Sequence, residues 1–397
     1  MDTISTENMY AIPFFKKIPV AIERGEGVYV WDESGRKYVD LTAGWGVTSI
    51  GHANPVLADA ISKQSRTLLQ TPSSGLVYSP VRAALLKKMA EILPGKLSNV
   101  FFANSGAEAN DAVIKLARKI SGRLDVISMT QSFHGRTIST ASATGQSKHR
   151  EKYNPLMPNY RFVPFNDLDA MAREIDDKVA AVLLEPIQGE GGVIIPKEGY
   201  LEGVSALCRE NGVYLIVDEV QTGFCRTGPM FAVNRHKMEV DFMTMAKGIG
   251  GGFPFAAFAV TEAVSKKVEI GDHGGTYCGN PLGCAAALSV IQYLMDHDIE
   301  NHVETVGKYV IDRMKTLQKR YPELISDVRG RGLLVAVEFR DKLMAEKVYS
   351  ECLKTGLFIN MTQGYIFRIF PALNITLDEI GEGLGIFEAA IAFVAGQ

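Results

Sequence analysis

Short apolar runs constrain the fold of this chain more than any other feature of its sequence. Val179-Ala-Ala-Val-Leu-Leu184 contains no polar residue. Apolar residues on both faces of a strand are typical of a parallel sheet that helices cover on both sides. Further strands are expected over residues 124–129, 213–217 and 242–245, and helices over residues 107–120 and 201–211. This alternation predicts an α/β fold with a mainly parallel sheet.

The two ends of the chain follow other patterns. Residues 27–41 alternate apolar and polar side chains around a Glu33-Ser-Gly35 turn, which predicts a hairpin. From Pro281 onward a long helical stretch leads to a region that mixes helices with a strand over residues 333–339. With 397 residues the chain is long enough for two domains, and we place the boundary near residue 285.

Composition excludes several classes of partner. A formal net charge of -3 gives no reason to expect a nucleic acid or an anionic membrane as a partner. No apolar stretch reaches the ~20 residues that span a bilayer, and the N-terminus has no signal-peptide pattern. The five cysteines lack C-x-x-C spacing, so we expect free thiols, no disulfide framework and no metal site. A cytoplasmic protein is the simplest interpretation.

Lys247 is the strongest candidate for a catalytic residue. It lies between the apolar run Phe242-Met-Thr-Met-Ala246 and a glycine-rich bend. Burial lowers the pKa of a lysine because it disfavours the charged form. Such an amine can form a Schiff base with a carbonyl compound. About thirty residues upstream, Asp218 ends another apolar strand. A buried acid and an imine-forming lysine are what a pyridoxal phosphate enzyme needs, because the acid keeps the pyridine nitrogen protonated.

Ser105 and Gly106 begin the helix that we predict over residues 107–120. A serine can cap a helix, and glycine lets the backbone approach a ligand closely. The first amide groups of that helix would then point at an anion. Many Ser-Gly helix starts only cap the helix, so this motif alone does not identify a phosphate site.

Three further segments carry candidate substrate-binding residues. Phe133 could stack on a flat heterocycle, and Arg136 could bind a carboxylate through two hydrogen bonds. Glu185 and Glu190 lie on a glycine-rich loop after a strand, which suggests the rim of a cleft. Arg368 stands between apolar residues on a strand and therefore requires an anion. That anion is either a protein carboxylate or a substrate carboxylate.

Together these motifs resemble the class III aminotransferases, which are fold-type I pyridoxal phosphate enzymes. The resemblance covers nearly the whole chain and is strongest to the acetylornithine and ornithine aminotransferase branch. It implies a large cofactor-binding domain over residues 56–285 and a smaller α+β domain. The smaller domain would combine residues 1–55 with residues 286–397. It also implies a homodimer with shared active sites.

The resemblance assigns roles to individual residues. Lys247 would hold the cofactor as a Schiff base, and Asp218 would pair with the pyridinium nitrogen. The other cofactor-binding residues would be Ser105, Gly106 and Ala107 at the phosphate, Phe133 and Val220 on the two faces of the ring, and Gln221 at the ring hydroxyl. Thr276 would reach the phosphate from the neighbouring subunit.

The same resemblance implies the substrates. Arg368 would bind the α-carboxylate of glutamate and Arg136 its side-chain carboxylate, so 2-oxoglutarate would be the acceptor in a ping-pong reaction. Glu190 would pair with Arg368 when another amine donor is bound. The donor would be the terminal amine of N-acetylornithine or ornithine, which belongs to arginine metabolism. Trp45 stands where that branch has a smaller aliphatic residue, and Pro371-Ala372 replaces its usual Pro-Pro.

Other functions stay open or are excluded by the sequence. Trp45 at a substrate entrance would also fit a broad ω-amino acid, 4-aminobutyrate or diamine transaminase. An aminomutase or epimerase on the same fold would keep Lys247 and Asp218, but it has less use for two arginines. A P-loop ATPase is excluded because the chain has no G-x-x-x-x-G-K-[ST] motif. A nicotinamide enzyme would need an early βαβ fingerprint, which is not apparent.

Overall fold

A computed structural model of the chain describes residues 2–396. Its larger lobe is built on a seven-stranded sheet in the order β4-β10-β9-β8-β7-β5-β6. The neighbouring strands among β6, β5, β7, β8 and β9 all pair in parallel, whereas β10 runs antiparallel to both of its neighbours. The strands are β4 (Leu97–Ala103), β5 (Asp125–Met129), β6 (Tyr160–Val163), β7 (Val179–Leu184), β8 (Tyr214–Asp218), β9 (Phe242–Met245) and β10 (Ala256–Thr261).

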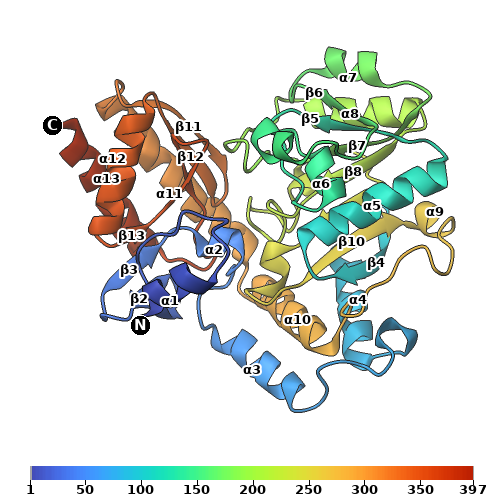
Figure 1. Ribbon diagram of the computed structural model, residues 1–397, viewed down its shortest axis with the longest axis horizontal. Helices are drawn as coiled ribbons and strands as arrows, with labels where there is room; N and C mark the ends of the chain where they lie inside the picture. Colours follow the sequence, from blue (N-terminus) through green and yellow to red (C-terminus); the bar gives the residue numbers. More distant parts are fainter. Residues whose placement is uncertain (1, 397) are drawn as a thin grey trace.

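Helices surround this sheet (Figure 1). They are α4 (Pro80–Ile92), α5 (Gly106–Ser121), α6 (Ile138–Ala143), α7 (Leu168–Glu174), α8 (Tyr200–Glu210), α9 (Glu262–Ser265) and α10 (Pro281–Asp296). Every residue of β5, β7, β9 and β10 is buried. Burial on both faces explains why these strands read as apolar runs in the sequence.

The smaller lobe contains two four-stranded sheets. One consists of β1 (Ile22–Glu26), β2 (Tyr29–Asp32), β3 (Lys37–Asp40) and β13 (Leu357–Phe358). The other consists of β11 (Ile325–Arg331), β12 (Leu334–Phe339), β15 (Ile366–Ile369) and β14 (Asn360–Thr362). Because β13 pairs with β3, residues near the two ends of the chain share a sheet. Figure 1 shows these N-terminal elements beside α11 (Ile299–Arg320), α12 (Lys342–Lys354) and α13 (Leu377–Ala395).

The predicted α/β fold is confirmed. The helices and strands predicted in the large lobe all exist, with ends within about one residue of those expected, and the predicted hairpin corresponds to β2 and β3. The long helical stretch after Pro281 divides into α10 and α11. The domain limits at residues 55 and 285 stay a prediction, and residue 285 lies inside α10.

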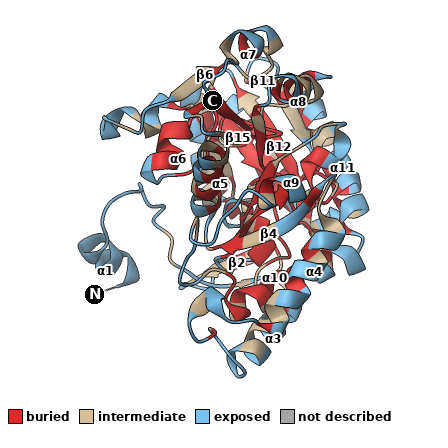
Figure 2. Cartoon of the chain, turned by 90° about the vertical axis from the view of Figure 1, so that its right-hand side faces the viewer, coloured by how far each residue is buried: buried red, intermediate tan, exposed pale blue. Residues whose placement is uncertain are grey.

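Three N-terminal helices complete the chain: α1 (Thr3–Tyr10), α2 (Ala43–Gly46) and α3 (Pro55–Ser65). Helix α1 has no buried residue, and Figure 2 shows it on an exposed arm away from the body of the molecule. Within residues 2–396, none of the helices combines the length and the apolar character of a membrane-crossing segment.

Candidate active site

A cavity of about 420 Å³ opens where β7, β8 and β9 end. In α/β sheets, ligands bind at this carboxyl edge of the strands. Ten of the thirteen predicted site residues line the cavity: Ser105, Gly106, Ala107, Phe133, Arg136, Glu190, Asp218, Val220, Gln221 and Lys247. The fold thus brings together predicted residues that lie up to 142 positions apart in the sequence.

Lys247 directly follows β9 and begins the short helix η5 (Lys247–Gly250). Burial lowers the pKa of its amine, although the nearby Glu190 and Asp218 carboxylates partly oppose this effect. Within residues 2–396 its amine makes neither a hydrogen bond nor an ion pair. The Lys247 backbone also has a φ of 47°, an uncommon value for a non-glycine residue. The structure therefore presents an unpaired amine to the cavity, as a nucleophilic lysine requires.

Asp218 ends β8 and is held by three polar groups. The Asn110 side-chain amide donates to its Oδ2 atom at 2.7 Å, and His134 Nδ1 lies 2.8 Å from the same oxygen. The backbone N–H of Val220 donates to Oδ1 at 3.0 Å. Asp218 is only 3% exposed, and these bonds fix its carboxylate in one orientation at the cavity wall.

Asn110 is a site residue that the sequence reasoning missed. Its amide bridges Asp218 and the backbone oxygen of His134, and its own oxygen accepts a hydrogen bond from Thr244 at 2.7 Å. A signal did exist, because Asn110 is a polar residue on the buried face of α5, four positions after Gly106. A buried amide needs partners, and here one partner is the predicted acid.

Helix α5 begins at the cavity with the predicted cap. The Ser105 hydroxyl accepts the Glu108 N–H at 3.2 Å, and the Glu108 carboxylate accepts the Ser105 N–H at 3.0 Å. A Cβ atom on Gly106 would stand only 2.9 Å from Val220 Cγ1. Residue 106 must therefore be glycine for α5 to begin this close to Val220. The helix start leaves amide groups that can bind an anion in the cavity.

Glu190, which is partly exposed to the cavity, forms an ion pair with the buried Arg368. Glu190 Oε1 lies 2.7 Å from Arg368 Nη1, and Gln221 bonds both residues, at 3.3 Å to Glu190 and 3.0 Å to Arg368. Burial would raise the pKa of Glu190, but the charges of Arg368 and Lys247 lower it to about 2. Arg368 is 1% exposed and lies behind the cavity wall, so Glu190 separates it from the cavity.

Phe133 and Arg136 line the cavity from the segment after β5. The Arg136 guanidinium lies 5.7 Å from the centre of the Phe133 ring. Arg136 is exposed and has no ion-pair partner among the described residues. Glu185, below this segment, accepts the N–H groups of Phe133 and Gly189, each at 3.0 Å. Burial raises the pKa of Glu185 to about 7, and its two bonds to N–H groups anchor the backbone of both segments.

Trp45 and Thr276 lie outside this cavity. Trp45 is half exposed and packs edge-on against Phe15, with 6.3 Å between the centres of the two rings. Four consecutive left-handed residues, 43–46, hold it there, and Val47 then lines the cavity. Thr276 is exposed, and its carbonyl oxygen accepts hydrogen bonds from Gln70 and Ser74. The roles predicted for these two residues stay predictions.

The cavity residues fit pyridoxal phosphate. Its aldehyde can react with an unpaired lysine amine, and its phosphate needs the amide groups that α5 presents beside Gly106. Its pyridine nitrogen needs a fixed carboxylate, which Asp218 offers. This fold and lysine site define a transferase of fold type I.

Comparisons with known proteins agree with this geometry. The family model described as "Aminotransferase class-III" matches residues 13–391. An acetylornithine aminotransferase of Methanothermobacter thermautotrophicus is 42% identical over 391 residues, which cover 98% of each chain. The ornithine aminotransferase of Toxoplasma gondii superimposes with a TM-score of 0.94 at 31% identity, covering 99% of this chain and 94% of the other. Another structure of that enzyme, with a TM-score of 0.93, has partial occupancy of PLP at its active site.

The chain belongs to the class III aminotransferases. It is a transaminase, and the predicted family, fold type and enzyme class are confirmed.

Proposed function

We propose that the protein is a pyridoxal phosphate-dependent aminotransferase that moves the terminal amino group of N-acetylornithine or ornithine to 2-oxoglutarate. The observation that carries this proposal is the cavity in which Lys247, Asp218 and the start of α5 face one another. A ping-pong reaction then uses one site for both half-reactions. This activity would place the enzyme in arginine metabolism.

The chain's own residues perform three tasks in this chemistry. Pyridoxal phosphate supplies a carbonyl for the amine and a ring that accepts electrons. Lys247 would bind that carbonyl, and the donor's amine would replace it there. The freed Lys247 amine would then take the proton from the donor carbon that carries the amino group and hold it for return. Asp218, oriented by Asn110 and His134, keeps the ring nitrogen protonated. The amides of Gly106 and Ala107, with Ser105, hold the phosphate.

Gln221, Phe133 and Val220 would orient the ring. Gln221 would hold the ring hydroxyl, because its side chain already lies at the cavity wall between Glu190 and Arg368. Phe133 and Val220 would cover the two faces of the ring.

Two cationic groups would select the acceptor. Arg136 is an exposed cation that lines the cavity and has no ion-pair partner among the described residues, and Arg368 is buried behind Glu190. When glutamate binds, its α-carboxylate would replace Glu190 at Arg368, and its side-chain carboxylate would bind Arg136. When N-acetylornithine binds, Arg136 would take the donor's carboxylate while Glu190 keeps Arg368 neutral, as it does in the structure.

The similarity to acetylornithine aminotransferases supports this donor. Trp45 supports an alternative, because its half-exposed ring lies beside Phe15 two residues before the cavity-lining Val47. An apolar entrance of this kind would favour ω-amino acids, 4-aminobutyrate or diamines. An aminomutase or epimerase has less support, since it leaves the paired arginines without a function.

A homodimer with shared sites is part of the proposal. Large apolar side chains are exposed close to Thr276, and patches of this kind are typical of protein interfaces. They include Leu68, Leu69, Leu76, Tyr78, Ile270 and Tyr277. The segment 70–74 bonds the carbonyl oxygen of Thr276, so a second copy that covers this patch would also bring Thr276 to the partner's cavity. A cytoplasmic location fits the five free cysteines.

Substitution of Lys247 tests the central assignment. Lys247→Ala should abolish steady turnover and the imine absorbance of the purified protein. Lys267→Ala, which removes a surface lysine beside Tyr214, is the matched control and should change neither. Normal multiple-turnover activity in Lys247→Ala would show that another residue carries the chemistry.

A further inference from the structure

Arg226 is a buried cation whose charge no carboxylate neutralises. It is 3% exposed, and it has no ion-pair partner within residues 2–396. Its Nη1 atom donates to the backbone oxygens of Leu333 at 3.0 Å and Pro371 at 2.6 Å. Its Nη2 atom is buried without a hydrogen-bond partner among the described residues. A buried, uncompensated charge is costly, so its presence calls for an explanation.

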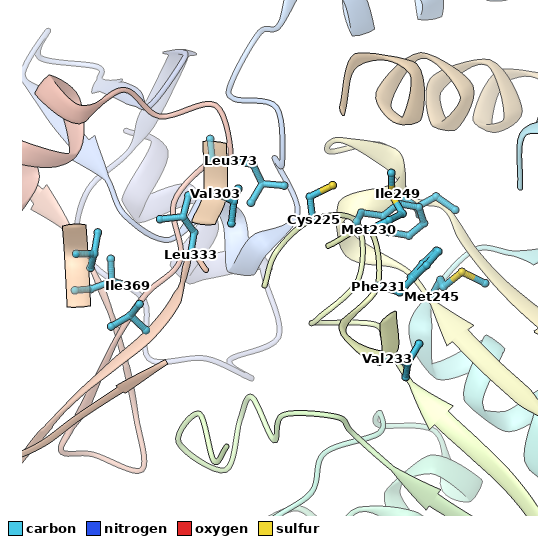
Figure 3. Close-up of a cluster of buried hydrophobic side chains, with 14 of the residues drawn as sticks. Cys225, Met230, Phe231, Val233, Met245, Ile249, Val303, Leu333, Ile369 and Leu373 are labelled. Carbon is cyan, nitrogen blue, oxygen red and sulfur yellow. The ribbon is translucent and has the colours of Figure 1, made fainter. Parts of the chain in front are cut away.

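The position of Arg226 is strongly determined by the fold. It lies in the segment after β8, and the two residues before it, Phe224 and Cys225, both have positive φ values. Figure 3 shows Cys225 between the buried side chains of Val303 and Leu333 and those of Met230 and Ile249. The Leu333 N–H donates back to the Arg226 carbonyl at 3.0 Å. Backbone strain of this kind persists only where the surroundings impose it, and it concentrates at functional sites.

Arg226 is close to the other buried arginine, Arg368. The charge of Arg368, after burial itself, disfavours a charge on Arg226. Both residues lie near Phe370: the Arg368 guanidinium is 4.4 Å from its ring centre. A Cβ atom on Gly46 would lie 3.2 Å from the Phe370 ring and 3.9 Å from Arg226 Nη2. Two cations therefore stand behind one wall of the cavity, and the one carboxylate paired with them is Glu190.

We propose that Arg226 is a positioning residue that makes the Arg368 pocket select a substrate carboxylate. Glu190 neutralises one of the two arginines, and a positive charge remains behind the cavity wall. A substrate carboxylate that displaces Glu190 from Arg368 is therefore also attracted by a charge that it does not touch. This inference rests on the proposed function and identifies what sets the affinity of the site for the dicarboxylate acceptor.

The effect should fall on one half-reaction only. A donor whose single carboxylate binds Arg136 gains little from Arg226, because Glu190 already covers Arg368. Glutamate and 2-oxoglutarate bring a carboxylate to Arg368 and gain the attraction of both arginines. Because no carboxylate pairs with Arg226 within residues 2–396, we expect its charge to change the binding of this carboxylate roughly tenfold.

The test compares Arg226→Gln with wild type in the two half-reactions. We expect the KM for 2-oxoglutarate to rise about tenfold, while kcat and the donor half-reaction change less than threefold. Arg226→Lys, which keeps the charge, should restore most of the affinity at neutral pH. An unchanged KM in Arg226→Gln would overturn the proposal.

Arg329 provides a matched control. It also joins the lobes through backbone oxygens, bonding Gly192 and Val193. Unlike Arg226, it is neutralised by two carboxylates, Asp327 and Glu338, each at 2.7 Å. Arg329→Gln should therefore leave the KM for 2-oxoglutarate unchanged even if it lowers thermal stability. An equal rise in KM in both glutamine variants would show that Arg226 acts only through the lobe contact and would overturn the proposal.

A second measurement covers the case in which Arg226→Gln does not fold. A buried lysine loses its charge as the pH rises, whereas arginine keeps it. The ratio of KM values for 2-oxoglutarate, Arg226→Lys over wild type, should thus increase between pH 7 and pH 9.5. The neighbouring Arg368, Glu190, Lys247 and Cys225 are common to both proteins and cancel in this ratio. A constant ratio near one would contradict the inference.

The proposed function can be tested separately from the role of Arg226. If wild-type enzyme that has reacted with a donor does not react with 2-oxoglutarate, the acceptor assignment is wrong. If wild type reacts and Arg226→Gln reacts with the same KM, the acceptor assignment stands and only the role of Arg226 is wrong.

Discussion

Replacing Glu190 with glutamine should separate the two half-reactions. In the structure Glu190 neutralises Arg368, and that arginine, together with Lys247, lowers the pKa of Glu190 to about 2 against the opposing effect of burial. Relative to the ordinary value of 4.5, this shift represents about 3 kcal/mol of preference for the charged carboxylate. An energy of that size corresponds to a factor of about 300 in an equilibrium constant, and solvent at the partly exposed Glu190 side chain reduces the expected effect to about 100-fold.

The loss should appear only with donors that leave Arg368 without a carboxylate. For N-acetylornithine, Glu190→Gln should reduce kcat/KM by up to about 100-fold, because Arg368 would be buried without a counter-charge. Glutamate supplies its own carboxylate to Arg368, so its half-reaction should change less than about threefold.

Single-turnover spectroscopy of the imine absorbance measures both half-reactions in the same protein. Glu198→Gln is the matched control, since it removes an exposed carboxylate from the same segment between β7 and α8. Equal losses with N-acetylornithine and glutamate would refute the reasoning, as would the absence of any loss with N-acetylornithine.

Two further predictions concern acid stability and assembly. The pKa of Glu190 is lowered in the folded state, so its pair with Arg368 contributes stability above pH 4.5 that is lost as the pH falls towards 2. Acid unfolding should show this contribution in wild type and not in Glu190→Gln, and identical curves would contradict it. Mixed dimers of a Lys247→Ala chain with a Thr276→Ala chain should retain one fully wild-type site. Two partly defective sites would instead place Thr276 in its own subunit's site.

The parts of the fold that were predicted depend on local sequence. Strands β7 and β9 begin and end at the predicted residues. Both faces of these strands are buried, and this burial requires the apolar runs from which they were predicted. Strand β10, Ala256-Ala-Phe-Ala-Val-Thr261, was not predicted as the antiparallel neighbour of β4 and β9. Its place depends on partners up to 164 positions away, and alanine-rich sequence is equally common in helices.

The same distinction applies to the site. Lys247 and Asp218 could be inferred because each is a charged residue at the end of an apolar run. A charged side chain in such a buried position points to a chemical function. Arg226 could not, because Arg226-Thr-Gly228 reads as an ordinary polar turn. Its importance appears only when Leu333 and Pro371 enclose it and leave it without a carboxylate.

The most direct test of the proposed function is a donor panel followed by the acceptor, read by half-reaction spectroscopy on the purified holoenzyme. N-acetylornithine or ornithine should remove the imine absorbance rapidly, and 2-oxoglutarate should restore it with release of glutamate. If 4-aminobutyrate, other ω-amino acids or diamines outran both by an order of magnitude, the enzyme would be a broad ω-transaminase. If pyruvate restored the absorbance faster than 2-oxoglutarate, the two-arginine account of the acceptor would be contradicted.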